Sequence, residues 1–169
     1  MKIIVLAGGL STERDVSLAS AAGICRTLIE KGHDAFLLDV FLGLEHAPEH
    51  LEDVFTLPGH GLEIAKNISC EEPDLAAVKA SRPDQSDCFL GPNVIELCRL
   101  ADITFLGLHG GEGENGKLQA TFDLLGIRYT GPDSLGCAVA MDKGLTKQVF
   151  LQAGIDTCLL YTSDAADEL

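Results

Sequence analysis

Basic residues are scarce in this sequence. Its 169 residues include 12 lysines and arginines against 26 aspartates and glutamates, which gives a formal net charge of −14. Nucleic acids and anionic membranes bind basic surfaces, so this balance argues against both as partners. It still permits a phosphate group that one or two lysines and backbone N–H groups hold locally.

The sequence also lacks long apolar runs and metal-type cysteine spacing. No apolar stretch approaches the length of a membrane-spanning helix, and the short run after Lys2 stops at Gly8, too early for a secretory signal peptide. The six cysteines form no CxxC pair. We interpret them as small buried side chains in a reducing cytoplasm, and we expect a cytoplasmic protein.

What the sequence does contain is an alternation of short apolar runs with amphipathic segments. The predicted strands are 2–7, 35–40, 102–108 and 127–130. The predicted helices are 13–31, 92–100, 117–125, 134–141 and 142–152. This order predicts an α/β fold with a mainly parallel open sheet flanked by helices.

The segment 43–90 interrupts this alternation. Five of the six prolines in the chain lie between Pro48 and Pro92, and ten acids face three bases over 45–87. We therefore predict an irregular, solvated, acidic insertion. Within it we expect one short strand at 62–68 and a short helix near 74–80.

Two glycine-rich loops follow predicted strands, and they are the candidate functional segments. In the first loop, Glu13 stands where a helix begins; it either complements the helix dipole or points across the strand ends to bind a cationic group. The second loop begins at His109 and contains Glu114. Because open α/β sheets bind ligands at the carboxyl ends of their strands, we expect the two loops to converge at one rim.

The sequence does not satisfy three common binding motifs, for dinucleotides, phosphate and metal. The first loop lacks the GxGxxG of dinucleotide-binding folds. The stretch 111–117 has the spacing of a phosphate-binding loop, but Leu118 stands where serine or threonine should bind magnesium. His46 and His50 have the spacing of metal ligands on one helix face, but Pro48 between them makes a regular helix doubtful. We expect no metal site in this sequence.

Three motifs, in this order, resemble the D-alanine–D-alanine ligases of the ATP-grasp superfamily. They are Gly8-Gly9-x-Ser11-x-Glu13-Arg14-Asp15-Val16-Ser17, then His109-Gly110 with Gly113-Glu114-Asn115-Gly116-x-x-Gln119, then Tyr129-Thr130-Gly131 followed by Ala140-Met141-Asp142-Lys143. The resemblance covers 1–42 and 91–157. It implies a Rossmann-like, pre-ATP-grasp substrate-binding domain over 1–131 and the first helices of the ATP-grasp central domain over 132–157.

The resemblance implies an enzyme that joins two D-alanines for the peptidoglycan precursor. ATP would phosphorylate the first carboxylate, and the second amino group would attack the acyl phosphate and release ADP and phosphate. Mg²⁺ would be required, with ligands downstream of this sequence. The resemblance also implies a cytoplasmic homodimer.

Carried over by motif position, six residues receive roles. Glu13 would bind the ammonium group of the first D-alanine, and Ser17 would orient Glu13 by hydrogen bonding. His109 would lie beside the substrates, where it helps to position or deprotonate the attacking group. The remaining roles fall to Gly110 and Glu114, in the loop network that closes the site, and to Lys143, on the ATP phosphates. Asp15 departs from the family, which usually has glutamate there.

Other interpretations stay open at this point. A ligase that uses D-lactate or D-serine as second substrate would have the same N-terminal domain. A non-catalytic α/β binding module would be favoured if Glu13 and His109 lay far apart. Residues 158–169 do not resemble the family and look like translated sequencing-adapter sequence. Since the adenine pocket and magnesium carboxylates of the family lie downstream, we expect the 169-residue chain alone not to catalyse.

Overall fold

The computed structural model describes residues 1–65, 67–68 and 71–158 and confirms the α/β architecture. Its sheet has three parallel strands in the order β2-β1-β3. The central strand is β1 (Lys2–Ala7), with β2 (Asp34–Asp39) on one side and β3 (Ile103–Leu106) on the other. Residues 3–7 of β1 are all buried, as expected for a parallel strand with both faces covered.

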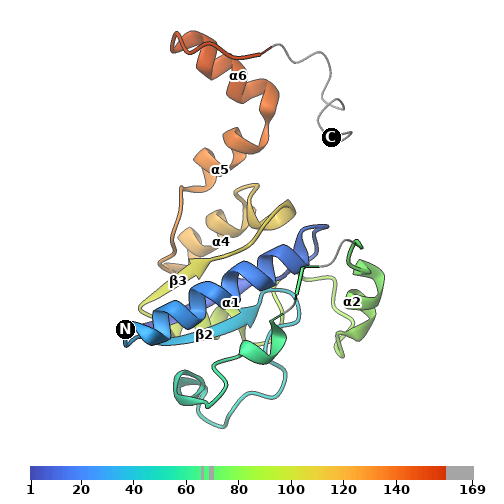
Figure 1. The fold of residues 1–169 in the computed structure, drawn as a ribbon, viewed down its shortest axis with the longest axis vertical. Coiled ribbons are helices and arrows are strands. Elements are labelled where there is room, and N and C mark those ends of the chain that lie inside the picture. The colour runs from blue at the N-terminus through green and yellow to red at the C-terminus, as the bar shows by residue number, and fades with distance from the viewer. Residues whose placement is uncertain (66, 69–70, 159–169) are drawn as a thin grey trace.

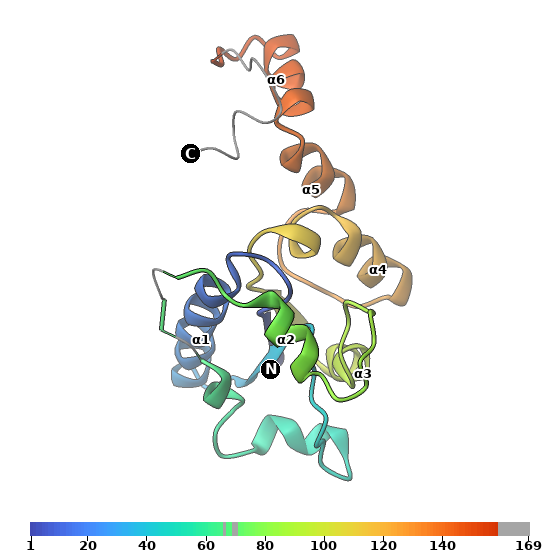
Figure 2. The same ribbon diagram turned by 90° about the vertical axis from the view of Figure 1, so that its right-hand side faces the viewer.

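Helices cover both faces of this sheet (Figures 1 and 2). Helix α1 (Arg14–Glu30) lies on one face, while α3 (Val94–Leu100) and α4 (Lys117–Leu125) lie on the other. Side chains alternate along β1, so Ile3 and Val5 share a core cluster with α1, and Ile4 and Leu6 share the second cluster with α3 and α4. Residues 1–131 thus form the body of the molecule.

The predicted strand at 127–130 is reduced to a single β-bridge between Thr104 and Tyr129. Two backbone hydrogen bonds make it, from Thr104 N to Arg128 O (2.8 Å) and from Thr130 N to Thr104 O (3.0 Å). The prediction of a full strand was wrong because the run pairs only around Thr104.

The insertion is irregular, as predicted, but it is more than a solvated loop. It contains two 3-10 turns, Leu51–Thr56 and Leu62–Ile64, and the helix α2 (Leu75–Ser81). The helix prediction is confirmed, and Asp74 caps it. The strand prediction at 62–68 is wrong in its described part, where the second turn lies.

Several contacts attach the insertion to the body, among them buried side chains and backbone hydrogen bonds. The side chains of Val54 and Phe55 are buried in the core. The ends of the insertion meet beside the end of β2, where Gly91 N donates to Val40 O (2.8 Å) and Leu44 N donates to Pro92 O (2.9 Å). We call this pair of hydrogen bonds the clasp.

Beyond the body, α5 (Ser134–Met141) and α6 (Lys143–Gln152) lead away from the sheet (Figure 1). We call residues 133–153 the arm. The predicted bounds of α5 are confirmed, and α6 begins one residue later than predicted, because Asp142 is its cap. No helix in the described part of the chain is both long and apolar enough to span a bilayer. Of the unusual segment 158–169, all but Cys158 lies outside the described residues.

Candidate functional site

The two glycine-rich loops meet at one rim of the sheet, as the parallel arrangement of β1 and β3 predicts. Ser11 Oγ in the first loop donates to the carbonyl oxygen of His109 in the second (2.6 Å). A Cβ atom on Gly110 would lie only 3.0 Å from Glu13 Oε2. Glu13 and the His109 segment are therefore neighbours, which removes the observation that would have favoured a non-catalytic module.

Glu13 is the exposed residue that immediately precedes α1. Its side chain makes no capping hydrogen bond to the helix, so it is not held at the helix end by such a bond. Among the described residues it has no lysine, arginine or histidine partner. This carboxylate is therefore available to a cationic group at the rim.

A buried ion pair next to Glu13 holds the first loop in place. Arg14 and Asp39 are only 4% and 2% exposed, and their side chains pair directly. Arg14 Nη1 also donates to Gly9 O (2.6 Å), while Asp39 Oδ1 accepts from the backbone of Phe41 and Leu42. The sequence interpretation missed this pair; its one signal was an acid that ends an apolar strand.

Ser17 lies one turn into α1 and is fully buried. Its Oγ donates to Gly107 O (2.7 Å) and accepts from Gly8 N (2.9 Å), so it joins the ends of β3 and β1. Ser17 meets Glu13 through the backbone, where Ser17 N donates to Glu13 O (2.9 Å), and neither of these Oγ hydrogen bonds goes to the Glu13 carboxylate. Ser17 supports the rim through the backbone of both loops.

The half-buried imidazole of His109 lies along α1, with Nε2 at 3.3 Å from Ser20 Oγ. Glu13 immediately precedes α1, and Ser20 lies about two turns further along on the same side of the helix. A carboxylate and an imidazole thus border one stretch of α1. This arrangement can receive an ammonium group and place a proton acceptor nearby.

The rest of the second loop is held by its own polar groups. Gly110 N donates to Glu114 Oε2 (2.8 Å), and Gln119 Nε2 donates to Gly113 O (2.9 Å). Lys117 forms an ion pair with Glu112 at 2.9 Å, which lowers the pKa of that carboxyl through a hydrogen bond. Since Lys117 is paired with an acid of its own loop, the phosphate-binding interpretation gains no support.

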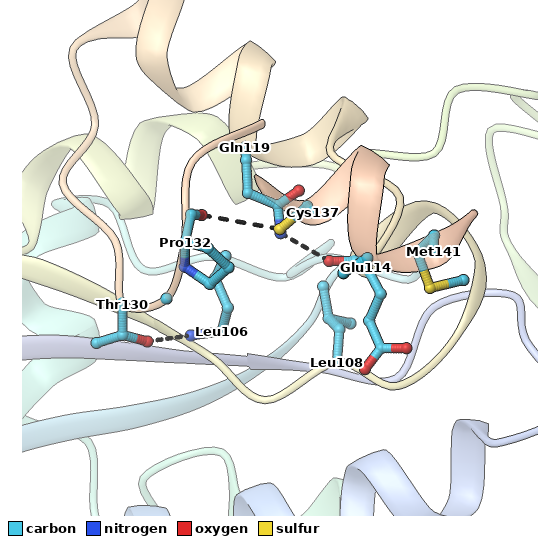
Figure 3. Close-up of a pocket in the computed structure, with 11 residues that line it drawn as sticks. Leu106, Leu108, Glu114, Gln119, Thr130, Pro132, Cys137 and Met141 are labelled. Atoms are coloured by element: carbon cyan, nitrogen blue, oxygen red, sulfur yellow. Dashed lines mark hydrogen bonds between the residues drawn. The ribbon is translucent and has the colours of Figure 1, made fainter. Parts of the chain in front are cut away.

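A pocket of about 320 Å³ lies beside this loop, between the end of β3, α4 and α5 (Figure 3). Its lining residues are Leu106, Leu108, Gly113, Glu114, Gln119, Thr130, Gly131, Pro132, Cys137, Ala140 and Met141.

Lys143 is not brought to the rim. It is the exposed first residue of α6, which projects away from the sheet (Figure 1). The sequence motif joins Lys143 to the other site residues, but the described structure brings together only Glu13, Ser17, His109 and their loop. No cluster of three or more metal-ligating side chains occurs in residues 1–65, 67–68 and 71–158.

Comparison with known proteins points to one family. Residues 2–132 match the family model described as "D-ala D-ala ligase N-terminus". The D-alanine–D-alanine ligase of Lacticaseibacillus casei strain BL23 is 45% identical over 159 residues, which cover 93% of this chain and 43% of that protein. The corresponding ligase of Pediococcus pentosaceus is 43% identical over 170 residues, and the match covers 99% of this chain and 47% of that protein.

Solved structures show the same fold. The D-alanine–D-alanine ligase of Bacillus anthracis in complex with ATP superposes with a TM-score of 0.56 at 23% identity, over 93% of this chain and 38% of that one. In every comparison the chain spans less than half the length of its relative.

Proposed function

The chain belongs to the D-alanine–D-alanine ligase family by its N-terminal region, and from this premise we propose that it supplies the first-substrate site of an ATP-dependent ligase that joins two D-alanines. The observation that carries the proposal is the meeting of Glu13 with the His109 loop at the rim of the sheet. The product would serve peptidoglycan precursor synthesis.

Amide formation requires a better leaving group than the oxygen of a free carboxylate, and phosphorylation supplies it. The carboxylate of the first D-alanine is phosphorylated by ATP, and the amino group of the second attacks the acyl phosphate, so the C–N bond forms as phosphate leaves. ADP and phosphate are the by-products. Since the related Bacillus anthracis enzyme was solved with ATP, the nucleotide is part of the proposal, with Lys143 as a contact to its phosphates.

Glu13 would hold the ammonium group of the first D-alanine, because its carboxylate is exposed at the rim and has no cationic partner in the described chain. His109, beside the same face of α1, would position or deprotonate the attacking amine. Gly110 and Glu114 would keep the loop closed through their mutual hydrogen bond. Ser17 would act indirectly, by fixing the ends of β1 and β3.

The described residues do not fit a magnesium site, since they contain no suitable cluster of ligands. We assign them no step that involves the metal. The family model ends at residue 132, just before the Asp133 cap of α5, which supports a domain boundary there and α5–α6 as the start of an ATP-grasp domain. A cytoplasmic homodimer is the working form that the family suggests.

A chimera tests the proposal. Residues 1–157 joined to the remaining part of the Lacticaseibacillus casei ligase should release phosphate from ATP when D-alanine is added. In this chimera Glu13→Gln should raise the KM for the first D-alanine by about tenfold or more, because it removes a charge-assisted hydrogen bond.

Glu30→Gln, an exposed change at the other end of α1, is the matched control and should leave that KM unchanged. A normal KM in the Glu13→Gln chimera would overturn the assignment of Glu13.

A further inference from the structure

The pocket beside the second loop is distinct from the rim that holds Glu13 and His109. It extends from the end of β3 to α5, and neither Glu13, Ser17 nor His109 lines it (Figure 3). Most of its wall is apolar, with Leu106, Pro132 and Met141 among the lining side chains. It therefore can enclose a compact apolar group.

Besides the Thr130 hydroxyl, whose oxygen accepts from Leu106 N, its wall includes the amide of Gln119. Gln119 Nε2 donates to Gly113 O, which fixes the amide orientation and leaves Oε1 buried with no hydrogen-bond partner in the described part of the protein. The Cys137 thiol is directed at Pro132 O. A buried carbonyl oxygen without a donor is unfavourable, so the pocket favours a ligand that brings N–H groups.

The pocket is also electronegative. Glu114 has no basic partner among the described residues, and no lysine, arginine or histidine lines the wall. Burial raises the pKa of the Cys137 thiol, and the carboxylates of Asp133 and Glu114 raise it further. A cation is therefore favoured over a neutral molecule, and an anion is disfavoured.

We propose that this pocket binds a small primary ammonium compound that carries a compact apolar group. The ammonium group donates to Gln119 Oε1 and to the Glu114 carboxylate, while the apolar group packs on Leu106, Pro132 and Met141. Free D-alanine is disfavoured because no base lines the pocket to pair with its carboxylate. This inference does not depend on the proposed ligase function.

A ligand bound in the pocket would alter a hydrogen bond at the rim. Glu114 Oε2 accepts from Gly110 N at 2.8 Å, and Gly110 lies against Glu13. An ammonium group that shares the Glu114 carboxylate weakens this hydrogen bond, so the amide of Gly110 reports binding directly.

The test uses the 169-residue chain, isotope-labelled for ¹H–¹⁵N NMR, with cyclohexylamine as probe. Cyclohexanol and cyclohexanecarboxylate are the controls, because they carry a neutral and an anionic group, respectively, on the same apolar ring. The amine should bind about tenfold more tightly than the alcohol and shift the resonances of the Gly110 amide and the Gln119 side chain. The carboxylate should not bind.

Variants locate the site. Ala140→Phe, which fills the pocket from α5, should abolish amine binding, while Ala138→Phe, at an exposed position that does not line the pocket, should not. Glu114→Gln keeps an acceptor for Gly110 N and should weaken the binding of the amine but not the binding of the alcohol.

Equal affinity for amine and alcohol, absence of binding in the millimolar range, or unchanged binding by Ala140→Phe would each overturn the proposal. Circular dichroism confirms that each variant is folded. Loss of ligase activity in the chimera with intact amine binding would refute only the proposed function.

Discussion

The helices of the arm and the long helix of the body differ both in how they are capped and in what covers them. Asp133 and Asp142 cap α5 and α6 through their side chains. Nevertheless α6 buries none of its residues and α5 only Cys137, whereas α1, which has no side-chain cap, buries six. A side-chain cap therefore marks the start of the arm helices, while packing decides how firmly a helix is held.

The largest loss of stability is expected in the body, when the buried carboxylate that pairs with Arg14 is removed. Asp39→Ala would leave the buried Arg14 guanidinium without its partner, and we expect the free energy of unfolding to fall by about 3–5 kcal/mol. Urea denaturation measures the loss. Asp156→Ala, at an exposed acid beyond the arm, is the control and should leave stability unchanged.

A smaller loss of stability is expected when the hydroxyl that joins the ends of β1 and β3 is removed. Ser17→Ala leaves Gly8 N–H and Gly107 C=O without their buried partner, which should lower the free energy of unfolding by about 1–3 kcal/mol. Ser20→Ala, on the exposed side of the same helix, should have little effect. Equal effects of the two changes would show that the rim is not held through Ser17.

The body should also respond to pH through its buried thiols. Burial raises the pKa of Cys25 and of Cys98 from 9.0 to about 11. Their stabilisation is complete below pH 9, where folded and unfolded thiols are both protonated, and is lost as pH rises toward 11, because only the unfolded thiols ionise.

At pH 10 we expect about 1 kcal/mol less stability for each thiol. Urea denaturation between pH 7.5 and 10 should show the decrease, and it should be smaller in a Cys25→Ala/Cys98→Ala variant. A pH dependence that survives both substitutions intact would assign it to other groups.

The smallest global effect is expected in the arm. Asp142→Ala removes the side-chain acceptor of Leu145 N and should weaken α6 by about 1 kcal/mol. Because α6 buries none of its residues, unfolding of the body should change by less than about 0.5 kcal/mol. Far-ultraviolet circular dichroism should lose helical signal while the urea midpoint stays the same; a shifted midpoint would show that arm and body unfold together.

The same contrast explains what sequence could predict. Apolar periodicity and Asp133 located the arm helices at the correct residues, since a helix start is a local event. The apolar run at 127–130 was taken for a strand because its composition is that of a strand, but pairing depends on its neighbours and reaches only Tyr129. The burial of Val54 and Phe55 likewise depends on distant segments.

At the site, sequence motifs identified both loops, and the parallel order of strands was enough to predict that Glu13 and His109 meet. The partner of Arg14 was missed because Asp39 lies 25 residues away and no motif links them. The partners of Ser17 were missed because they are backbone groups of Gly8 and Gly107, which carry no signal in the sequence.

The clasp has a consequence for how this protein tolerates changes in length. With Val40 bonded to Gly91 and Leu44 to Pro92, the polypeptide leaves and re-enters the body at a single point, so the segment between is a closed loop. Doubling the length of such a loop costs only about 0.6 kcal/mol. Residues added between the second 3-10 turn and α2, away from Val54 and Phe55, should therefore leave the sheet intact, and this stretch is a suitable site for inserting a tag or a reporter domain.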